Sequence, residues 1–291
     1  MSKIIYKNYD QAALDAEYNN QAKVPDFTAY LREFAALNET TRTEYPGLVS
    51  YCYDEPTGQL LDIIYPADRG KDPCPVQVFF HGGYWKSLSR ENFTFVARAF
   101  ADYGIATVIV DYDLIPAITM EELVRQCRQS LAFLYQHASS LGLDAEDIHI
   151  SGHSAGGHLT AMCLGTDWQS FAEDLPAQIV KSGIGISGLY NLLPIRLSFL
   201  QKDLALSMET AARMSPVHLP EPANGRLHLL LGSKEGPEYH AQSTGMHDAW
   251  PDQAEPPISL TPYNHFSIVG SLAEPTSYLS SYIRQAMGLQ K

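Results

Sequence analysis

The stretch that most constrains the fold runs from Asp147 to Gly157, where DIHI is followed directly by SGHSAGG. The first residues predict a short buried strand, and the apolar pattern after the glycines predicts a helix. Between them, Gly152, Ser154 and Gly156 form the pattern G-x-S-x-G. In this context the glycines allow a tight, strained turn that lifts a serine hydroxyl to the top of a sheet. The alternative is a glycine-rich turn whose serine only caps the helix. The strand–turn–helix context favours a nucleophile.

The rest of the chain alternates between strand-like and helix-like segments. Strands are predicted at residues 48–55, 60–66, 76–80, 105–112, 147–152, 179–188, 226–232 and 256–263. Helices are predicted at residues 92–104, 120–142, 155–165 and 275–288. The first two strands are separated by PTGQ, which indicates a hairpin. Alternating strands and helices predict an α/β fold, with a mostly parallel central sheet covered by helices on both faces.

Two segments stand outside this alternation. Residues 9–43 read as helical with polar breaks, and Asp26 is placed to cap the second helix. Residues 189–224 are rich in Leu and Met and end in SPVHLPEPANG, which interrupts the strand–helix rhythm. We expect one domain over residues 1–291, in which these two segments form a small helical cap.

Composition excludes several classes of function. The formal net charge is −13 and the pI is about 5.1, which argues against nucleic-acid binding, since that needs clustered Lys and Arg. The N-terminus lacks the apolar core of a signal peptide, and no apolar run is long enough to span a bilayer. The four cysteines lie far apart, without a CxxC pair, and indicate reduced thiols in a cytoplasmic protein. No metal site and no cofactor are predicted. The oligomeric state stays open, a homodimer included.

A serine nucleophile needs a base, and the base needs an acid that orients it. In α/β-hydrolases these residues follow in the order Ser, Asp/Glu, His. The strand at 226–232 leads into SKEGPEYH, which offers Glu235 and, as a second choice, Glu238. Glu235 lies closer to the strand end, where the orienting carboxylate belongs. His265 follows the last strand and combines the right chain order with a loop position, so it is the predicted base.

The segment HGGYW ends an earlier strand, where an oxyanion hole can form. We expect the backbone N–H groups of Gly82 and Gly83, with that of Ala155, to converge on a developing oxyanion. The alternative is a turn with only a structural role, and this reading becomes the less favoured one if Ser154 is a nucleophile. The predicted substrate-binding residues are aromatic side chains near these motifs: Tyr84 and Trp85, which wall or anchor the loop, Tyr190 at the start of the insertion, and Phe266 beside the base.

These motifs resemble a known family. HGGYW, SGHSAGGHL, IVDYDL, SGLYNLLPI, MSP, GSKEGPEYHAQS and NHF resemble the kynurenine formamidase (arylformamidase) branch of the hormone-sensitive-lipase-like α/β-hydrolases, as does the N-terminal LDAEYNN. The resemblance spans nearly the whole chain. It implies the α/β-hydrolase fold, the triad Ser154, Glu235 and His265, oxyanion donors at Gly82 and Gly83, and a role in tryptophan catabolism. It also implies an aromatic amide or ester as the small-molecule substrate.

The chain departs from that branch at two places. Its acid is Glu235 where the branch usually has Asp, and Asn191 and Leu193 stand where the branch commonly has acidic residues. The leading hypothesis is a metal-independent serine hydrolase that removes a small, formyl-like acyl group from an aromatic amide or ester, with N-formylkynurenine as the natural candidate. The alternatives are a general short-chain carboxylesterase, an aryl carbamate or amide hydrolase, and a catalytically dead binding scaffold.

Overall fold

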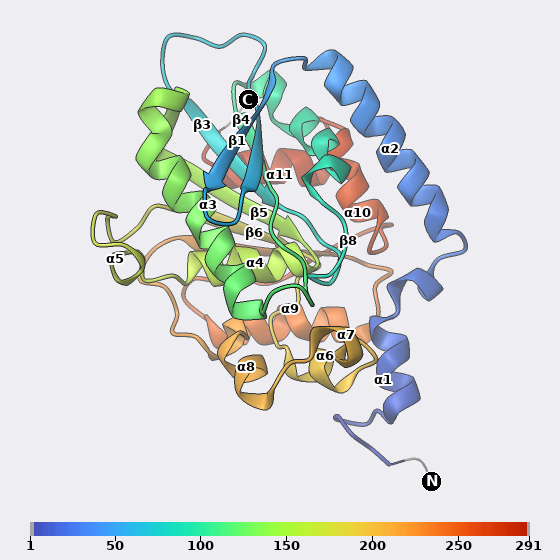
Figure 1. Cartoon of the computed structure of the whole chain (residues 1–291). Coiled ribbons are helices and arrows are strands. Elements are labelled where there is room, and N and C mark those ends of the chain that lie inside the picture. Colours follow the sequence, from blue (N-terminus) through green and yellow to red (C-terminus); the bar gives the residue numbers. More distant parts are fainter. Residues whose placement is uncertain (1–2, 290–291) are drawn as a thin grey trace.

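The protein is built on a twisted, mostly parallel sheet with helices on both faces (Figure 1). A computed structural model describes residues 3–289. Among these residues the sheet has eight strands in the order β1-β2-β4-β3-β5-β6-β7-β8. The pairs β1–β2 and β2–β4 are antiparallel, and all pairs from β4 to β8 are parallel. The predicted α/β class and the N-terminal hairpin are therefore confirmed.

The elements have the following bounds. The strands are β1 Leu48–Asp54, β2 Gln59–Ile64, β3 Cys74–Phe80, β4 Ala106–Val110, β5 Leu143–His153, β6 Ser182–Ile186, β7 Arg226–Gly232 and β8 Ile258–Leu260. The α-helices are α1 Gln11–Tyr18, α2 Phe27–Glu44, α3 Met120–Leu141, α4 Ala155–Leu164, α5 Trp168–Phe171, α6 Leu193–Leu197, α7 Gln201–Leu204, α8 Met208–Arg213, α9 Pro237–Ala249, α10 Ser267–Gly270 and α11 Tyr278–Ala286. The 3₁₀ helices are η1 Asn20–Lys23, η2 Arg90–Asn92, η3 Thr94–Ala99, η4 Ala101–Tyr103, η5 Pro216–His218 and η6 Ser271–Ala273.

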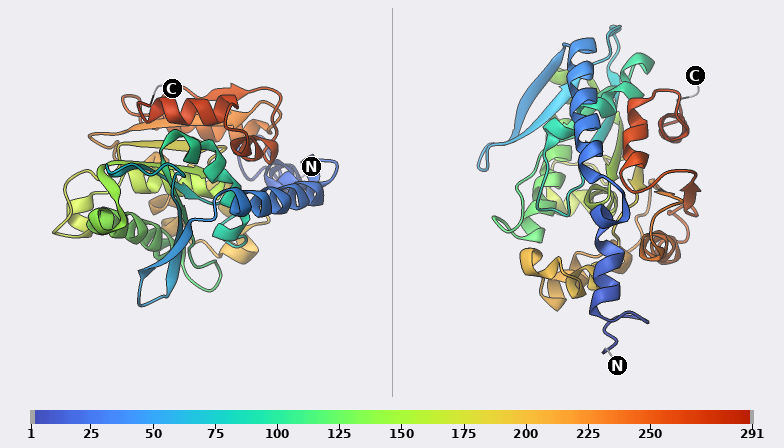
Figure 2. Two further views of the ribbon diagram at one scale, coloured as in Figure 1. Left: turned by 90° about the horizontal axis from the view of Figure 1, so that it is seen from above. Right: turned by 90° about the vertical axis from the view of Figure 1, so that its right-hand side faces the viewer.

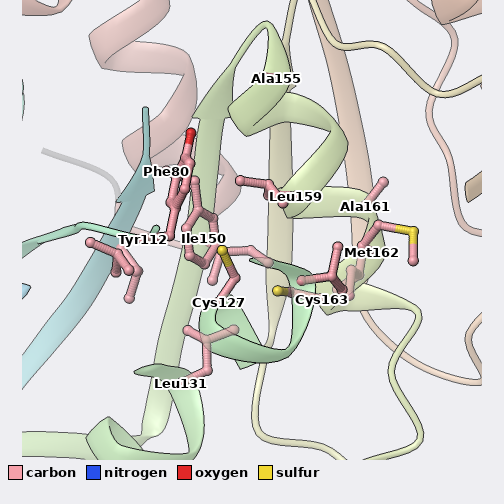
Figure 3. Packing of buried hydrophobic residues seen from close by; sticks show 14 of the residues in the cluster. Phe80, Tyr112, Cys127, Leu131, Ile150, Ala155, Leu159, Ala161, Met162 and Cys163 are labelled. Carbon is pink, nitrogen blue, oxygen red and sulfur yellow. The ribbon is translucent and has the colours of Figure 1, made fainter. Parts of the chain in front are cut away.

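Strand β3 shows why the central strands are mostly apolar. Successive side chains of a strand point to opposite faces of the sheet. Val78 and Phe80 belong to the core that packs under α3 and α4, whereas Phe79 belongs to the core under η3, α10 and α11. Figure 3 shows Phe80 and Ile150 of the sheet beside Cys127 of α3 and other side chains of the first core. A sheet buried on both faces needs mostly apolar residues, and its buried polar side chains are paired, as Gln77 is with Ser151. The burial of apolar side chains is the main force that stabilises the domain.

The structure differs from the predicted elements at two places. Residues 92–104 were expected to form one helix, but the chain forms the successive 3₁₀ helices η2, η3 and η4. Phe93 and Phe100 interrupt the turns with non-helical φ values of −129° and −130°, and both side chains are buried in the second core. Burial of the aromatic rings thus overrides helical propensity. Helix α9 was not predicted, although Pro237 at its first position is a common helix start.

The N-terminal segment and the insertion lie beside one another at one end of the molecule. In Figure 1 helix α1 stands next to α6 and α7, and α2 runs along one side of the domain, which Figure 2 shows from the side. A hydrogen bond at 2.6 Å from the Phe199 N–H to Asp15 joins the two segments. Within residues 3–289 no helix is both long and apolar enough to cross a membrane.

Candidate active site

The candidate catalytic residues lie at the carboxyl ends of parallel strands. Ser154 follows β5, Glu235 follows β7, His265 follows β8, and the Gly82–Gly83 loop follows β3. Because parallel strands end at the same edge of a sheet, residues far apart in the sequence meet there. The fold therefore brings the predicted residues to one edge.

Ser154 occupies a strained turn. Its backbone has φ 58° and ψ −115°, and its N–H donates to the carbonyl of Ile186 at 2.8 Å. The side chain makes no capping hydrogen bond to α4, so the structure does not support the alternative in which this serine only caps the helix. A Cβ on Gly156 would lie 1.9 Å from the carbonyl oxygen of Phe80, which explains why the turn needs glycine there. A non-glycine residue held at positive φ is a feature that clusters at functional sites.

Glu235 and His265 form a buried pair. Glu235 Oε2 lies 2.7 Å from His265 Nδ1, and the Glu235 side chain is 1% exposed. Glu235 Oε1 accepts hydrogen bonds from the Gly232 N–H at 2.7 Å and from the Ser187 hydroxyl. A carboxylate with these donors stays in one orientation and holds the imidazole with its proton on Nδ1. This leaves His265 Nε2 free to act as a base.

Glu238, the second choice for the acid, is engaged elsewhere. Its carboxylate pairs with Lys7 Nζ at 3.0 Å, and its side chain is buried. The structure therefore brings Glu235, and not Glu238, to His265.

His153 helps to fix the backbone position of His265. Its Nε2 donates to the backbone carbonyl of His265 at 2.8 Å, and the two rings lie 4.6 Å apart. Burial, together with the nearby His265, lowers the pKa of His153 well below its ordinary value. A neutral His153 adds no charge to the site. No direct hydrogen bond joins Ser154 to His265 among the described residues, although both side chains line the same cavity; such contacts commonly tighten only when substrate binds.

The glycine loop lies against the serine turn. A Cβ on Gly82 would approach the Ser154 Cβ to 3.3 Å, so this loop is in contact with the turn. Gly83 has φ +113°, and a Cβ there would lie 2.1 Å from the Ser87 carbonyl oxygen. The N–H groups of Gly82 and Gly83 donate none of the hydrogen bonds found among the described residues. They are available, as is the N-terminus of α4 at Ala155, to bind an oxyanion.

Tyr84 is held by a network that the sequence did not reveal. Its hydroxyl donates to the carbonyl of Tyr18 at 2.6 Å and lies 2.8 Å from the hydroxyl of Tyr239. Asn20 donates to both tyrosine hydroxyls, at 3.3 Å and 2.6 Å. The Tyr239 ring lies 4.7 Å from that of His265. This network joins the glycine loop, the N-terminal segment and the helix beside the candidate base.

Two predicted substrate-binding residues do not reach the cavity. Trp85 and Tyr190 are both 0% exposed and are absent from its lining. Trp85 turns into the first core and donates from Nε1 to His158 Nδ1 at 3.1 Å. Tyr190 packs against Gly185 and Gly188, where any Cβ would collide with its ring. Both rings anchor loops, and neither contacts the cavity, contrary to the expectation that they bind substrate.

The cavity has a volume of about 580 Å³ and opens at Ser154 and His265. Phe266, predicted to bind substrate, does line it and packs on Phe27 at 4.8 Å, and Tyr84 also lines it. The remaining wall comes mainly from the N-terminal segment and from residues 82–93 after β3, and a smaller part comes from the insertion. The lining contributed by the N-terminal segment and the insertion is Tyr18, Asn19, Asn20, Gln21, Phe27, Leu31, Phe34, Ala35, Asn38, Phe199 and Leu200.

The departure at Asn191 lies away from this cavity. Asn191 Oδ1 accepts the Leu193 N–H at 2.9 Å, and neither residue lines the cavity. Asn191 thus organises the start of α6. Neither of these two departures from the branch therefore contacts the cavity.

Among the described residues there is no group of three or more His, Cys, Asp or Glu side chains arranged to hold a metal ion. Metal independence remains a prediction, which rests on the completeness of the serine machinery.

Comparisons with known proteins agree with this geometry. The chain is 31% identical to kynurenine formamidase of Salmo salar over 83% of this chain and 82% of that protein. It is 27% identical to kynurenine formamidase of Danio rerio over 97% of this chain and 98% of that protein. A family model described as BD-FAE matches residues 61–185. Among solved structures, a candidate thioesterase from Silicibacter is 25% identical, covers 92% of this chain and 97% of its own, and has a TM-score of 0.79. The carboxylesterase EstE1, from a metagenomic library, is 18% identical over 91% of this chain and 98% of its own, with a TM-score of 0.68, and shares the fold.

Proposed function

Because this chain belongs to the kynurenine formamidase family of α/β-hydrolases, we propose that it hydrolyses N-formylkynurenine or a closely similar aryl formamide. The observation that carries the proposal is that His265, which pairs with the buried Glu235, lines the same cavity as Ser154. The reaction would release formate and an aryl amine in tryptophan catabolism. We keep a cytoplasmic location as part of the proposal.

In the proposed mechanism His265 Nε2 takes the proton of Ser154 as the hydroxyl oxygen attacks the formyl carbon. The carbonyl electron pair moves to oxygen, and the N–H groups of Gly82, Gly83 and Ala155 bind the resulting oxyanion. The C–N bond then breaks, and the imidazolium gives its proton to the leaving amine. Water, deprotonated by the same imidazole, attacks the formyl-serine; the ester bond to Ser154 then breaks, the imidazolium returns its proton to the serine oxygen, and formate is released. Glu235 holds the tautomer and stabilises the imidazolium through both steps.

The cavity supports an aromatic leaving group. Phe27, Phe34, Phe93 and Phe266 all contribute to its wall, and aromatic rings stack well on such surfaces. A volume of about 580 Å³ lies within the range of small-molecule sites. The oxyanion machinery itself treats amides and esters alike, so a short-chain carboxylesterase or an aryl carbamate hydrolase remains the second candidate.

A substrate panel tests the proposal. The purified protein would be assayed with N-formylkynurenine, p-nitrophenyl acetate and butyrate, and an aryl carbamate, with Ser154→Ala as the matched control. We expect the highest kcat/KM with N-formylkynurenine and no turnover in the control. A higher kcat/KM with the esters, or with the carbamate, would overturn the formamidase assignment. Covalent labelling of the wild type by a fluorophosphonate, absent in Ser154→Ala, would exclude a dead scaffold.

A further inference from the structure

The wall of the cavity contains a positively charged side chain, that of Lys86. Among the described residues that form its wall, Lys86 is the one Lys or Arg, and there is no Asp or Glu. The whole chain, by contrast, has a formal net charge of −13. A cavity wall with one ammonium group and no carboxylate favours a carboxylate-bearing ligand over a purely cationic one.

Lys86 is tied to the glycine loop. It lies three residues after Gly83, and its backbone N–H donates to the Gly83 carbonyl at 3.1 Å. Its ammonium group pairs with Asp203 of α7, and the two side chains are 31% and 30% exposed. An ion pair exposed to this degree contributes little stability and can exchange one partner for another at small cost. The ammonium group is therefore available to a ligand that enters the cavity.

We propose that Lys86 binds a carboxylate on the leaving group of the substrate, which replaces Asp203 as its partner. This inference rests on the proposed function and specifies its substrate class: an aryl amide or ester that carries a carboxylate. One loop then holds the substrate at two points, since Gly82 and Gly83 bind the carbonyl oxygen and Lys86 binds the carboxylate. A single ammonium group matches a monoanion, whereas phosphate recognition usually employs the planar fork of arginine.

Two matched substrate pairs test the inference. The first pair is N-formylkynurenine and 2′-formamidoacetophenone, which shares the formylated aryl ketone but lacks the amino-acid tail. The second pair is 4-acetoxybenzoate and phenyl acetate, which differ in one carboxylate. For each pair the ratio of kcat/KM of the substrate with the carboxylate to the substrate without it is measured in the wild type, Lys86→Met, Lys86→Arg and Asp203→Asn. Lys202→Met is the control, because Lys202 is an exposed neighbour on α7 outside the cavity wall.

We expect the ratio to fall about tenfold in Lys86→Met, the scale of a lost hydrogen bond to a charged group, with the change mainly in KM. Lys86→Arg should retain most of the ratio, Asp203→Asn should raise it, and Lys202→Met should leave it unchanged. Added salt should lower the wild-type ratio but not that of Lys86→Met, because screening weakens an ionic contact and a packing role would not respond.

The outcomes separate this inference from the proposed function. An unchanged ratio in Lys86→Met with both pairs, or an equal fall in Lys202→Met, overturns the role of Lys86 even if formamides are hydrolysed. Conversely, a fall in the ratio for the ester pair, with neither formamide hydrolysed, supports Lys86 and overturns the formamidase proposal.

Discussion

Glu235→Gln is expected to abolish most turnover while leaving the protein folded. The Gly232 N–H can only donate, and it lies 2.7 Å from Glu235 Oε1, so the carbonyl oxygen of a glutamine must take that position. The amide NH₂ then faces His265 Nδ1 at the place where Oε2 now accepts at 2.7 Å. To accept that N–H, His265 must carry its proton on Nε2. An Nε2 that already holds a proton cannot remove the one on Ser154.

The size of the loss follows from the tautomer. Exchanging the orienting carboxylate of a serine triad for its amide lowers kcat by about 10⁴-fold. That factor corresponds to about 5.5 kcal/mol of activation free energy. The substitution keeps the shape and the bond to Gly232, so we expect the free energy of unfolding to fall by no more than about 3 kcal/mol, the upper value for a hydrogen bond to a charged group.

The assay compares three variants. Hydrolysis of p-nitrophenyl acetate gives kcat, and urea unfolding followed by circular dichroism gives stability. Glu238→Gln is the matched control, because the Glu238 carboxylate pairs with Lys7 and not with His265. Glu235→Asp keeps the charge and should lose less activity than Glu235→Gln. If Glu238→Gln were the inactive variant and Glu235→Gln kept more than a tenth of the wild-type kcat, the tautomer argument would be refuted.

Three further predictions concern the nucleophile, metal ions and pH. Ser154→Ala should lower kcat by about 10³-fold or more with a wild-type circular dichroism spectrum; near-normal turnover would remove Ser154 from the mechanism. Dialysis against EDTA should leave kcat unchanged, and a loss restored by zinc or manganese would contradict the serine mechanism. Burial lowers the pKa of His158 to about 4. In the unfolded chain His158 is protonated as the pH falls below about 6.5, whereas in the folded protein it stays neutral until the pH approaches 4. The free energy of unfolding should therefore fall between pH 6.5 and 4. Urea unfolding should show this loss, with a smaller slope in His158→Gln; an unaltered slope would mean that other groups cause it.

The order and the type of the main elements could be predicted because they depend on local pattern. Strands such as β3 are buried on both faces and are therefore mostly apolar, and α3 has a strong helical period with Gly142 at its end. The triad order was predictable for the same reason, since each candidate residue follows a strand. The choice between Glu235 and Glu238 followed from distance to the strand end, and the geometry of the Glu235–His265 pair agrees with it.

The roles of several side chains could not be predicted from the sequence, because they depend on the direction in which each side chain points. Tyr84 and Trp85 are adjacent aromatic residues with positive φ values of 52° and 59°, yet one ring lines the cavity and the other enters the core. No local pattern separates them. The roles of Asn20 and Ser187 were missed because their partners, Tyr239 and Glu235, lie 219 and 48 residues away along the chain.

The positions of Asn20 and Tyr84 bear on where specificity resides. The insertion, which carries the departures Asn191 and Leu193, contributes only Phe199 and Leu200 to the cavity wall. The N-terminal segment contributes a larger part of that wall and also holds Tyr84, and with it the glycine loop, through the Tyr18 carbonyl and Asn20. A substitution in this segment can therefore alter both the shape of the leaving-group site and the position of the oxyanion donors, so KM and kcat should change together. The candidate triad lies at strand ends that the fold itself provides, so we expect substrate choice to depend more on the N-terminal segment and on the proposed contact of Lys86 than on the triad.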